Sequence, residues 1–320
     1  MALDQETHEL LARVAAMYYE QDMTQNQIAD ELGLSRVKVY RLLREARATK
    51  VVQINIDWPI KRDHHLEAEL QQAFGLRDAR VLRAMNEQAA LRQIGHLAAR
   101  YLEPMLTHSA RMAICLGRTT YEVIHAIRPD LQANVQVVQA IGTMPHAFAE
   151  YDSTALARQL AQKLGGQVMY LPSPLMADSS HAAMIIRSQR DIQHPLDAAR
   201  SADIALFGVG NLDPASSGFV RAGFLSSQDV AQFVGEGAVG DIAWHIFTED
   251  GRLYLTDFSE RVIGVTLDDL ERIPTTLAVA AGTAKSRAIL GALRTGVIDV
   301  LCIDDQAARK VLEMDERMPT

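Results

Sequence analysis

The sequence lacks the features of a disulfide-rich secreted protein and of a membrane protein. Its two cysteines, Cys115 and Cys302, do not supply a disulfide framework for 320 residues, so we expect buried free thiols. No apolar run reaches the roughly 18 residues that a membrane helix needs. The opening segment MALDQETHEL lacks the basic start and the apolar core of a signal peptide. We therefore expect a cytoplasmic protein without a membrane partner.

Internal repeats and low-complexity tracts are also missing, which excludes fibrous and disordered architectures. The composition is instead 48% apolar and 22% charged. Such a composition predicts a soluble globular protein with a large core, and 320 residues allow two domains. Because the formal net charge is −8, a basic segment in this chain is informative about partners.

The segment 24–50, TQNQIADELGLSRVKVYRLLREARATK, predicts a helix, a tight turn and a second helix. Thr24 can cap the first helix while Gln27 reaches back to the Thr24 amide. Gly33 tolerates a positive φ where the chain reverses, and Ser35 is a good cap for the second helix. The order and spacing of these signals are typical of a helix-turn-helix.

The second helix has one apolar face and one basic face. Its apolar residues recur at the spacing of a buried helical side: Val39, Leu42, Leu43 and Ala46. Between Ser35 and Lys50 there are six basic residues and one acidic residue, a net charge of +5 on a chain of −8. A local cationic field on an acidic protein favours binding to phosphates.

We therefore predict binding to double-stranded operator DNA, with an ordinary solvated helix pair as the alternative. The N-terminal part of the second helix is expected to meet base edges, whereas Arg44, Arg47 and Lys50 are expected to contact phosphates. The predicted DNA-contacting residues are Thr24, Gln25, Ser35, Arg36, Val37, Lys38, Tyr40, Arg41 and Arg44.

The DNA-binding domain is predicted to span residues 1–57. An earlier helix would complete its core through the stripe Leu11, Val14, Ala15 and Tyr18. The alternating segment 51–57 predicts a short strand that follows the recognition helix as a wing. Residues 58–320 form the second domain, which begins with a linker segment (58–76). Its amphipathic helix (64–76) would link the domains or form a dimer contact.

Short apolar runs alternate with helical patterns in the second domain. The runs are 79–84, 111–117, 135–142, 167–173, 202–210, 240–247, 275–282 and 298–304, and the helical patterns include 154–166, 229–235 and 285–296. This alternation predicts a mainly parallel sheet with helices on both faces.

Several predicted strand ends bear groups that suit an anionic ligand, and ligands of open parallel sheets bind beyond such ends. The segments are GRTT (117–120), GTMP (142–145), GVG (208–210) and AGTAKS (281–286). GRTT opens a helix, whose first amides and hydroxyls would bind an anion. A cation such as Lys285 fits a helix start if a phosphate neutralises it.

Two further residues extend this hypothesis of a phosphorylated ligand. Arg221 would either bind phosphate or form a surface ion pair. Asp241 would either accept hydrogen bonds from sugar hydroxyls or cap a turn. The spacing of these residues does not distinguish between the two roles of each. Each glycine after a strand has an ordinary turn as its alternative. The predicted effector-binding residues are Gly117, Arg118, Thr119, Thr120, Gly142, Thr143, Gly210, Arg221, Asp241 and Lys285.

Six segments together carry a resemblance to a known family. They are YYEQDMTQNQIADELGLSRVKVYRLL, GRTT, GVGN, RAGFLS, EGAVGDIAWHIF with its following DG, and AGTAKSRAI. In their order and spacing, over nearly the full length, the chain resembles the SorC/DeoR-type sugar-binding transcriptional regulators. The resemblance implies a winged helix-turn-helix followed by a Rossmann-like α/β domain related to glucosamine-6-phosphate deaminase and ribose-5-phosphate isomerase.

The same resemblance implies a function and roles for site residues. Such a regulator of a sugar or polyol catabolic operon is typically a tetramer that binds operator DNA and responds to a phosphorylated sugar. Carried over by position, four residues would bind the phosphate and Asp241 the sugar hydroxyls. The four are Thr119, Thr120, Arg221 and Lys285.

The related enzymes supply the alternative of a sugar-phosphate isomerase or deaminase. The deaminases have an Asp-Gly-His run after GVG, whereas here Pro214 follows Asp213 and the loop has no histidine. Without an acid/base pair we expect no catalytic residue. An imine between Lys285 and an aldehyde sugar is a further possibility. We expect no cofactor and no metal site, since adjacent His64 and His65 point about 100° apart on a helix.

Overall fold

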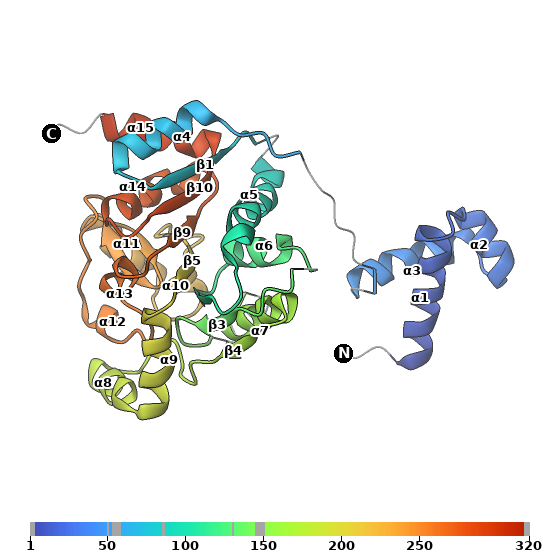
Figure 1. The fold of residues 1–320 in the computed structure, drawn as a ribbon, viewed down its shortest axis with the longest axis horizontal. Helices are drawn as coiled ribbons and strands as arrows, with labels where there is room; N and C mark the ends of the chain where they lie inside the picture. Colours follow the sequence, from blue (N-terminus) through green and yellow to red (C-terminus); the bar gives the residue numbers. More distant parts are fainter. Residues whose placement is uncertain are drawn as a thin grey trace. The chain divides into compact units, whose positions relative to one another are not determined.

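The computed structural model describes residues 4–49, 51–52, 59–84, 87–129, 131–144 and 151–316. The chain divides into two compact units, Met1–Pro59 and Ile60–Thr320 (Figure 1). Each unit has a hydrophobic core of its own. Within the described ranges, no helix combines the length and the apolarity that crossing a membrane requires.

The first unit contains the helices α1 (Gln5–Tyr19), α2 (Gln25–Leu32) and α3 (Arg36–Ala48). Their apolar sides pack on one another, and the buried residues are Leu11, Val14, Ala15, Met17, Ile28, Ala29, Val39, Leu42, Leu43 and Ala46. The predicted three-helix core is therefore confirmed, with Tyr18 only partly buried at its margin.

Local side-chain chemistry fixes the turn between α2 and α3. The Thr24 amide donates to Gln27 Oε1 at 2.9 Å, and Thr24 Oγ1 accepts from the Gln27 amide at 3.4 Å. Gly33 ends α2 with φ of 63°, a left-handed conformation that glycine adopts at little cost. Ser35 Oγ accepts from the amide of Lys38 at 3.2 Å and caps α3. The helix-turn-helix prediction is confirmed in these details.

The predicted wing at 51–57 lies mostly outside the described residues. Val51 and Val52 are described, and the Val52 amide donates to Ala46 O at 2.9 Å. Lys50 and residues 53–58 are not among the described positions. The wing therefore stays a prediction.

A seven-stranded parallel sheet forms the centre of the second unit, with the order β1-β10-β9-β5-β2-β3-β4. Its strands are β1 (Asp78–Leu82), β2 (Arg111–Ile114), β3 (Gln136–Gln139), β4 (Gln167–Met169), β5 (Ile204–Gly208), β9 (Thr276–Val279) and β10 (Val300–Asp304). All six pairings are parallel, which confirms the predicted sheet.

Helices cover both faces of this sheet, because its strands alternate residues between two apolar clusters. The α-helices of this unit are α4 (His64–Phe74), α5 (Glu87–Leu102), α6 (Arg118–Ala126), α7 (Ser153–Leu164), α8 (Ser180–Ser188), α9 (Arg190–Arg200), α10 (Gly218–Arg221), α11 (Ser227–Gly235), α12 (Asp257–Glu260), α13 (Leu267–Glu271), α14 (Ser286–Arg294) and α15 (Asp305–Glu316). Residues of α4, α14 and α15 pack on one face, and residues of α5, α6 and α7 on the other (Figure 1).

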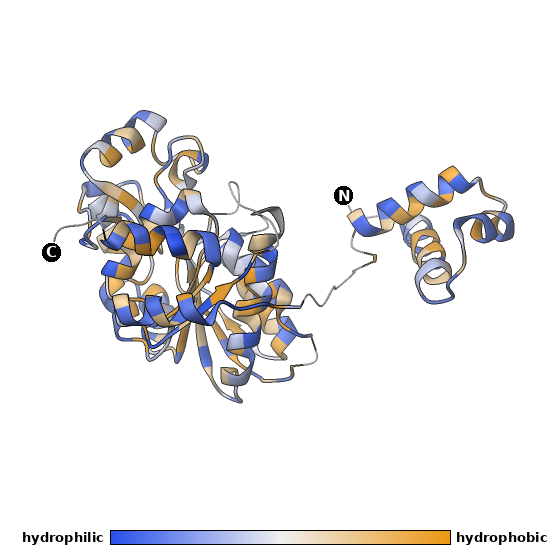
Figure 2. Cartoon of the chain, turned by 90° about the horizontal axis from the view of Figure 1, so that it is seen from above, coloured by the Kyte–Doolittle hydropathy of each residue, from blue (hydrophilic) through white to orange (hydrophobic). Residues whose placement is uncertain are grey.

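The strands are the most apolar part of this unit, as their orange colour in Figure 2 shows. Cys115 follows β2 and Cys302 lies within β10, and both are free and buried as predicted. Burial raises the pKa of the Cys115 thiol to about 12, so this thiol stays protonated and unreactive.

The prediction of a single strand at residues 240–247 is wrong. The segment is a hairpin of β7 (Ala238–Ile242) and β8 (His245–Thr248), which joins β6 (Gly210–Asn211) in a small antiparallel sheet. The loop residues Ala243 and Trp244 have φ of 50° and 68°. A two-residue hairpin loop usually has Asn or Gly at such positions, so the apolar run gave no sign of a turn.

Candidate functional site

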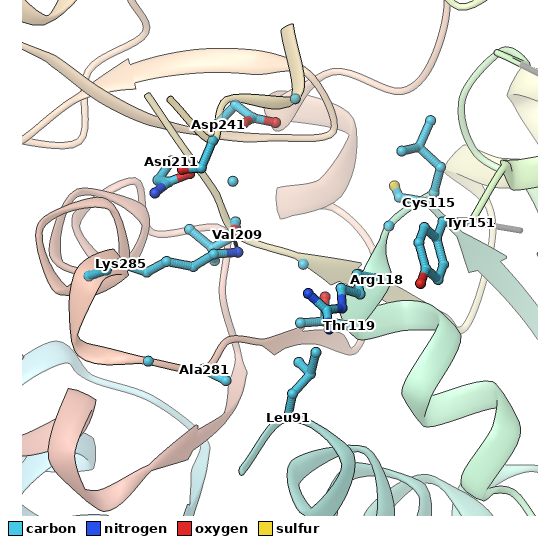
Figure 3. Close-up of a pocket in the computed structure, with 18 of the residues that line it drawn as sticks. Leu91, Cys115, Arg118, Thr119, Tyr151, Val209, Asn211, Asp241, Ala281 and Lys285 are labelled. Carbon is cyan, nitrogen blue, oxygen red and sulfur yellow. Dashed lines mark hydrogen bonds between the residues drawn. The ribbon is translucent and has the colours of Figure 1, made fainter. Parts of the chain in front are cut away.

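A cavity of about 710 Å³ lies at the carboxyl ends of the central strands (Figure 3). The neighbouring strands β2, β5 and β9 contribute the segments 115–119 and 208–211 and the residues Ala281 and Gly282. The β7 residue Asp241 completes this part of the wall. The cavity is therefore where a parallel sheet is expected to bind a ligand.

The N-terminus of α6 opens on the cavity. Gly117 precedes the helix with φ of 140°, and no side chain caps the first turn. At the other end of α6, Lys163 Nζ donates to His125 O at 2.6 Å and to Ile127 O at 2.9 Å. The positive end of the helix dipole thus remains available to a ligand, while a cation stabilises the negative end.

The GVG segment brings functional side chains close to the end of β5. A Cβ added at Gly208 would lie 2.3 Å from Thr119 Oγ1, and one added at Gly210 would lie 1.9 Å from Asp241 Oδ1. A Cβ at either position would therefore displace the side chain of Thr119 or Asp241. The two glycines therefore serve close approach rather than a turn alone.

Lys285 reaches into the cavity from the short helix η2 (Thr283–Lys285) that precedes α14. Its Nζ donates to Val209 O at 2.7 Å, as Figure 3 shows. Burial lowers the pKa of Lys285, the carboxylate of Asp241 raises it, and the charge of Arg118 lowers it again. The cavity therefore holds cations that disfavour one another.

Asp241 lies beside Asn211 in the cavity wall (Figure 3). Burial raises the pKa of Asp241 to about 6, while the charge of Lys285 and the amide of Trp244 act in the other direction. The Trp244 amide donates to Asp241 Oδ2 at 3.3 Å. Although deeply placed, the carboxyl group keeps some surface in the cavity, so it can accept hydrogen bonds from ligand hydroxyls.

The structure places seven of the ten predicted effector residues in the cavity wall: Gly117, Arg118, Thr119, Gly210, Arg221, Asp241 and Lys285. Arg221 reaches it from α10. Thr120 is fully buried outside the lining.

Gly142 and Thr143, which were also predicted as effector contacts, pack on other parts of the chain. Thr143 Oγ1 donates to Asp152 Oδ1 at 2.9 Å, within the N-cap of α7. A Cβ at Gly142 would lie 2.3 Å from Pro174 O. Both residues therefore pack strand β3 against neighbouring chain, and neither is in the cavity lining.

The lining residues that sequence reasoning missed include the polar or aromatic residues Tyr151, Asn211, Trp244 and Asp304. Asp304 Oδ2 accepts from the Gly282 amide at 2.7 Å, and its Oδ1 accepts from the Ala307 amide at 2.9 Å. Its position at the end of the last predicted strand was an available signal. Trp244 had no such signal, because the hairpin itself was not recognised.

The outward side of α3 forms the candidate DNA-binding surface. Val37 is 60% exposed and Tyr40 48% exposed, while Val39 between them is fully buried. The basic residues Arg36, Lys38, Arg41 and Arg44 are all exposed. The Arg44 guanidinium lies 6.0 Å from the centre of the Tyr40 ring. Thr24 and Gln25, with Arg36, line an open polar hollow beside α2.

A helix-turn-helix unit joined to an α/β unit whose cavity contains charged side chains defines the class of DNA-binding proteins with a ligand-binding domain. The sequence of residues 58–313 matches the protein family described as a putative sugar-binding domain. The chain is 32% identical to the transcriptional regulator LsrR of Klebsiella pneumoniae over 312 residues, covering 96% of this chain and 93% of the relative. It is 29% identical to the deoxyribonucleoside regulator of Bacillus subtilis, covering 97% and 99%.

The full-length sorbitol operon regulator SorC of Klebsiella pneumoniae has a similar structure. The TM-score is 0.72 at 26% identity, over 96% of this chain and all of SorC. The chain belongs to this family of SorC/DeoR-type sugar-binding transcriptional regulators. It is therefore a transcriptional regulator with a sugar-binding domain, and the isomerase or deaminase alternative is set aside.

Proposed function

We propose that this protein regulates a sugar or polyol catabolic operon and that a phosphorylated sugar in the cavity controls its binding to the operator. The observation that carries the proposal is the pair of cations Arg118 and Lys285. They line one cavity beside an uncapped helix start, and Arg118 contributes to the lowered pKa of Lys285. A phosphate dianion between them would relieve this repulsion and accept hydrogen bonds from the first amides of α6.

The proposed contacts of the effector follow from the two sides of the cavity. Arg118, Thr119, Arg221 and Lys285 bind the phosphate, and Asp241 binds the sugar hydroxyls. A carboxylate can accept from two adjacent hydroxyls, which a methyl or a carbonyl at the same carbon cannot replace.

On the DNA side, exposed residues of α3 enter the major groove. Arg36, Val37, Lys38, Tyr40 and Arg41 face base edges, whereas Arg44 binds phosphate. Thr24, Gln25 and Ser35 contact the backbone from the helix starts. We infer a homo-tetramer that pairs these helices on an inverted repeat in the cytoplasm. The effector acts by binding the arrangements of the subunits unequally.

The test is operator binding with and without effectors. Fluorescence anisotropy on DNA from upstream of the protein's own gene would be measured with phosphorylated tetroses, pentoses and hexoses. We expect specific binding that one of these sugars changes, and a Lys285→Met variant that binds DNA normally but no longer responds. Turnover of a sugar phosphate without any DNA binding would refute the proposal.

A further inference from the structure

The hairpin loop between β7 and β8 is strained at a bulky residue. Of the described residues, five other than glycine have a positive φ: Asp22, Ser109, Asn134, Ala243 and Trp244. The first three are small polar residues, whose side chains can bond locally in this conformation. Trp244, with φ of 68°, is an outlier, because a large side chain gains nothing there from the backbone. Strain of this kind persists where the side chain is needed.

The surroundings of Trp244 fix its indole in one place. The ring of Phe219 lies edge-on at 4.6 Å between centroids, and that of Phe224 at 5.8 Å. A Cβ at Gly218 would lie 3.9 Å from Trp244 Cζ2 and Cη2, so the six-membered ring packs beside α10. The residue is 6% exposed. The indole is therefore a rigid part of the molecule rather than a mobile surface group.

Trp244 also belongs to the cavity wall. It lines the cavity together with Gly218, Phe219 and Arg221, and its amide donates to Asp241 Oδ2 at 3.3 Å. One short loop thus brings an aromatic residue into the same cavity wall as the carboxylate that faces the ligand. A flat apolar surface beside a hydroxyl acceptor matches a sugar ring, which has an apolar C–H face and hydroxyls at its edge.

We propose that Trp244 determines ligand specificity, by contacting the C–H face of a cyclic sugar phosphate whose hydroxyls bond to Asp241. The inference rests on the proposed function and deepens it, since it selects ring sugars over open-chain polyols of the same size. An open-chain phosphate presents no fixed C–H face and loses more conformational freedom on binding. The phosphate contacts alone do not distinguish ring sugars from open-chain polyols.

Tryptophan fluorescence tests the contact directly. Trp58 is the only other tryptophan of the chain, so a Trp58→Phe protein reports on Trp244 alone. It would be titrated with glucose 6-phosphate, ribose 5-phosphate, sorbitol 6-phosphate and inorganic phosphate. We expect a saturable change of emission with the ring sugar that binds best, and none with inorganic phosphate.

Substitutions test the specificity. Trp244→Asn suits the positive φ but removes the ring, and we expect it to weaken binding of the ring sugar by about tenfold while sorbitol 6-phosphate is unaffected. Ala243→Gly keeps the indole and eases the neighbouring strain, so its ligand preference should equal that of the parent protein. Trp244→Phe should keep most of the preference. Lys285→Met should weaken every phosphate alike.

The outcomes separate this inference from the proposed function. If sugar phosphates bind and control the operator complex but ignore Trp244 in both the titration and the variants, the specificity assignment is overturned and the regulator proposal stands. If no sugar phosphate binds the parent protein, both are overturned. Should Trp244→Asn not fold, as circular dichroism would reveal, the titration of the Trp58→Phe protein still decides the question.

Discussion

Single residues in the cavity have properties that their sequence neighbours do not explain. Asp241 is a carboxyl group whose pKa burial raises to about 6, and Lys285 is an amine whose pKa burial lowers. The two come from segments more than 40 positions apart and meet because β7 and η2 border the same strand end. The sequence predicted both as ligand contacts, but the protonation of each depends on burial that only the fold creates.

Asp241 should make the stability of the protein depend on pH. The pKa of its carboxyl group is higher in the folded protein than the ordinary 3.8, so the folded state holds the proton more tightly. This contribution is present at low pH and is lost as the pH rises through about 6. Relative to Asp241→Asn, we expect the free energy of unfolding to fall by about 2 kcal/mol between about pH 4 and pH 7.

Urea unfolding at a series of pH values would measure this difference. Asp257→Asn is a matched control, because Asp257 is exposed at the start of α12. Parallel pH profiles for the parent protein and Asp241→Asn would contradict the assigned burial.

At the scale of elements, the recognition helix was predictable because its signals are local. Caps, the turn glycine and the apolar stripe of α3 all lie within 27 residues, at 24–50. The outward basic face then follows from helical geometry once the apolar stripe is buried.

Two arginines of this helix should differ in their effect on operator binding. Arg41→Ala should cost about 1 to 3 kcal/mol at one base pair and relax the preference there, since Arg41 is expected to read a base. Arg47→Ala, further along the exposed side, should weaken operator and random DNA alike and reduce the salt dependence. Competition binding on single-base operator variants distinguishes them. Equal behaviour of the two variants would remove the base-reading role of Arg41.

A second element, the segment before α4, is held next to the cavity wall. The Arg62 guanidinium donates to Glu67 Oε1 at 2.7 Å and Oε2 at 2.6 Å, and Glu67 Oε1 accepts from the Val81 amide at 3.0 Å. The Arg83 amide donates to Lys61 O at 2.8 Å, and the next residue, Ala84, lines the cavity. A ligand that contacts Ala84 at the end of β1 could therefore change the position of the segment that follows the DNA-binding unit.

Loosening this segment should uncouple the two functions. We expect Arg62→Met with Glu67→Gln to keep both effector and operator affinity while the effector no longer changes operator binding. The ion pair is removed without leaving a buried charge, and a glutamine can still accept from the Val81 amide. Lys61→Ala is the control, since Lys61 contributes its carbonyl oxygen. Anisotropy with and without effector measures the coupling, and an unchanged response in the double variant would argue against this route.

At the scale of the whole molecule, positive charge is found at both the candidate DNA-binding surface and the candidate effector site. The chain is acidic overall, with a net charge of −8, yet α3 and the cavity each bring several basic residues together. This arrangement keeps phosphate binding local and disfavours unspecific adhesion to nucleic acid.

The operator and the effector must change each other's binding affinity by the same factor. If the effector changes operator affinity by some factor, of order 5 to 150 for typical coupling energies, operator DNA should change effector affinity by the same factor. Calorimetric titration of the effector into the free protein and into its DNA complex would measure this. Scrambled DNA is the control, and unequal factors would mean that the two sites are not in one equilibrium.

The sequence by itself determined the elements whose causes are local: the helix-turn-helix with its caps, the parallel strands, and the strand ends that present Thr119, Gly210 and Lys285. Only the tertiary structure decided which strand ends meet. The order β9-β5-β2 brings three of them to one cavity, while packing against Pro174 and Asp152 turns Gly142 and Thr143 away. The strained turn at Trp244 also needed the fold, because contacts distant in the chain stabilise a conformation that local preference opposes.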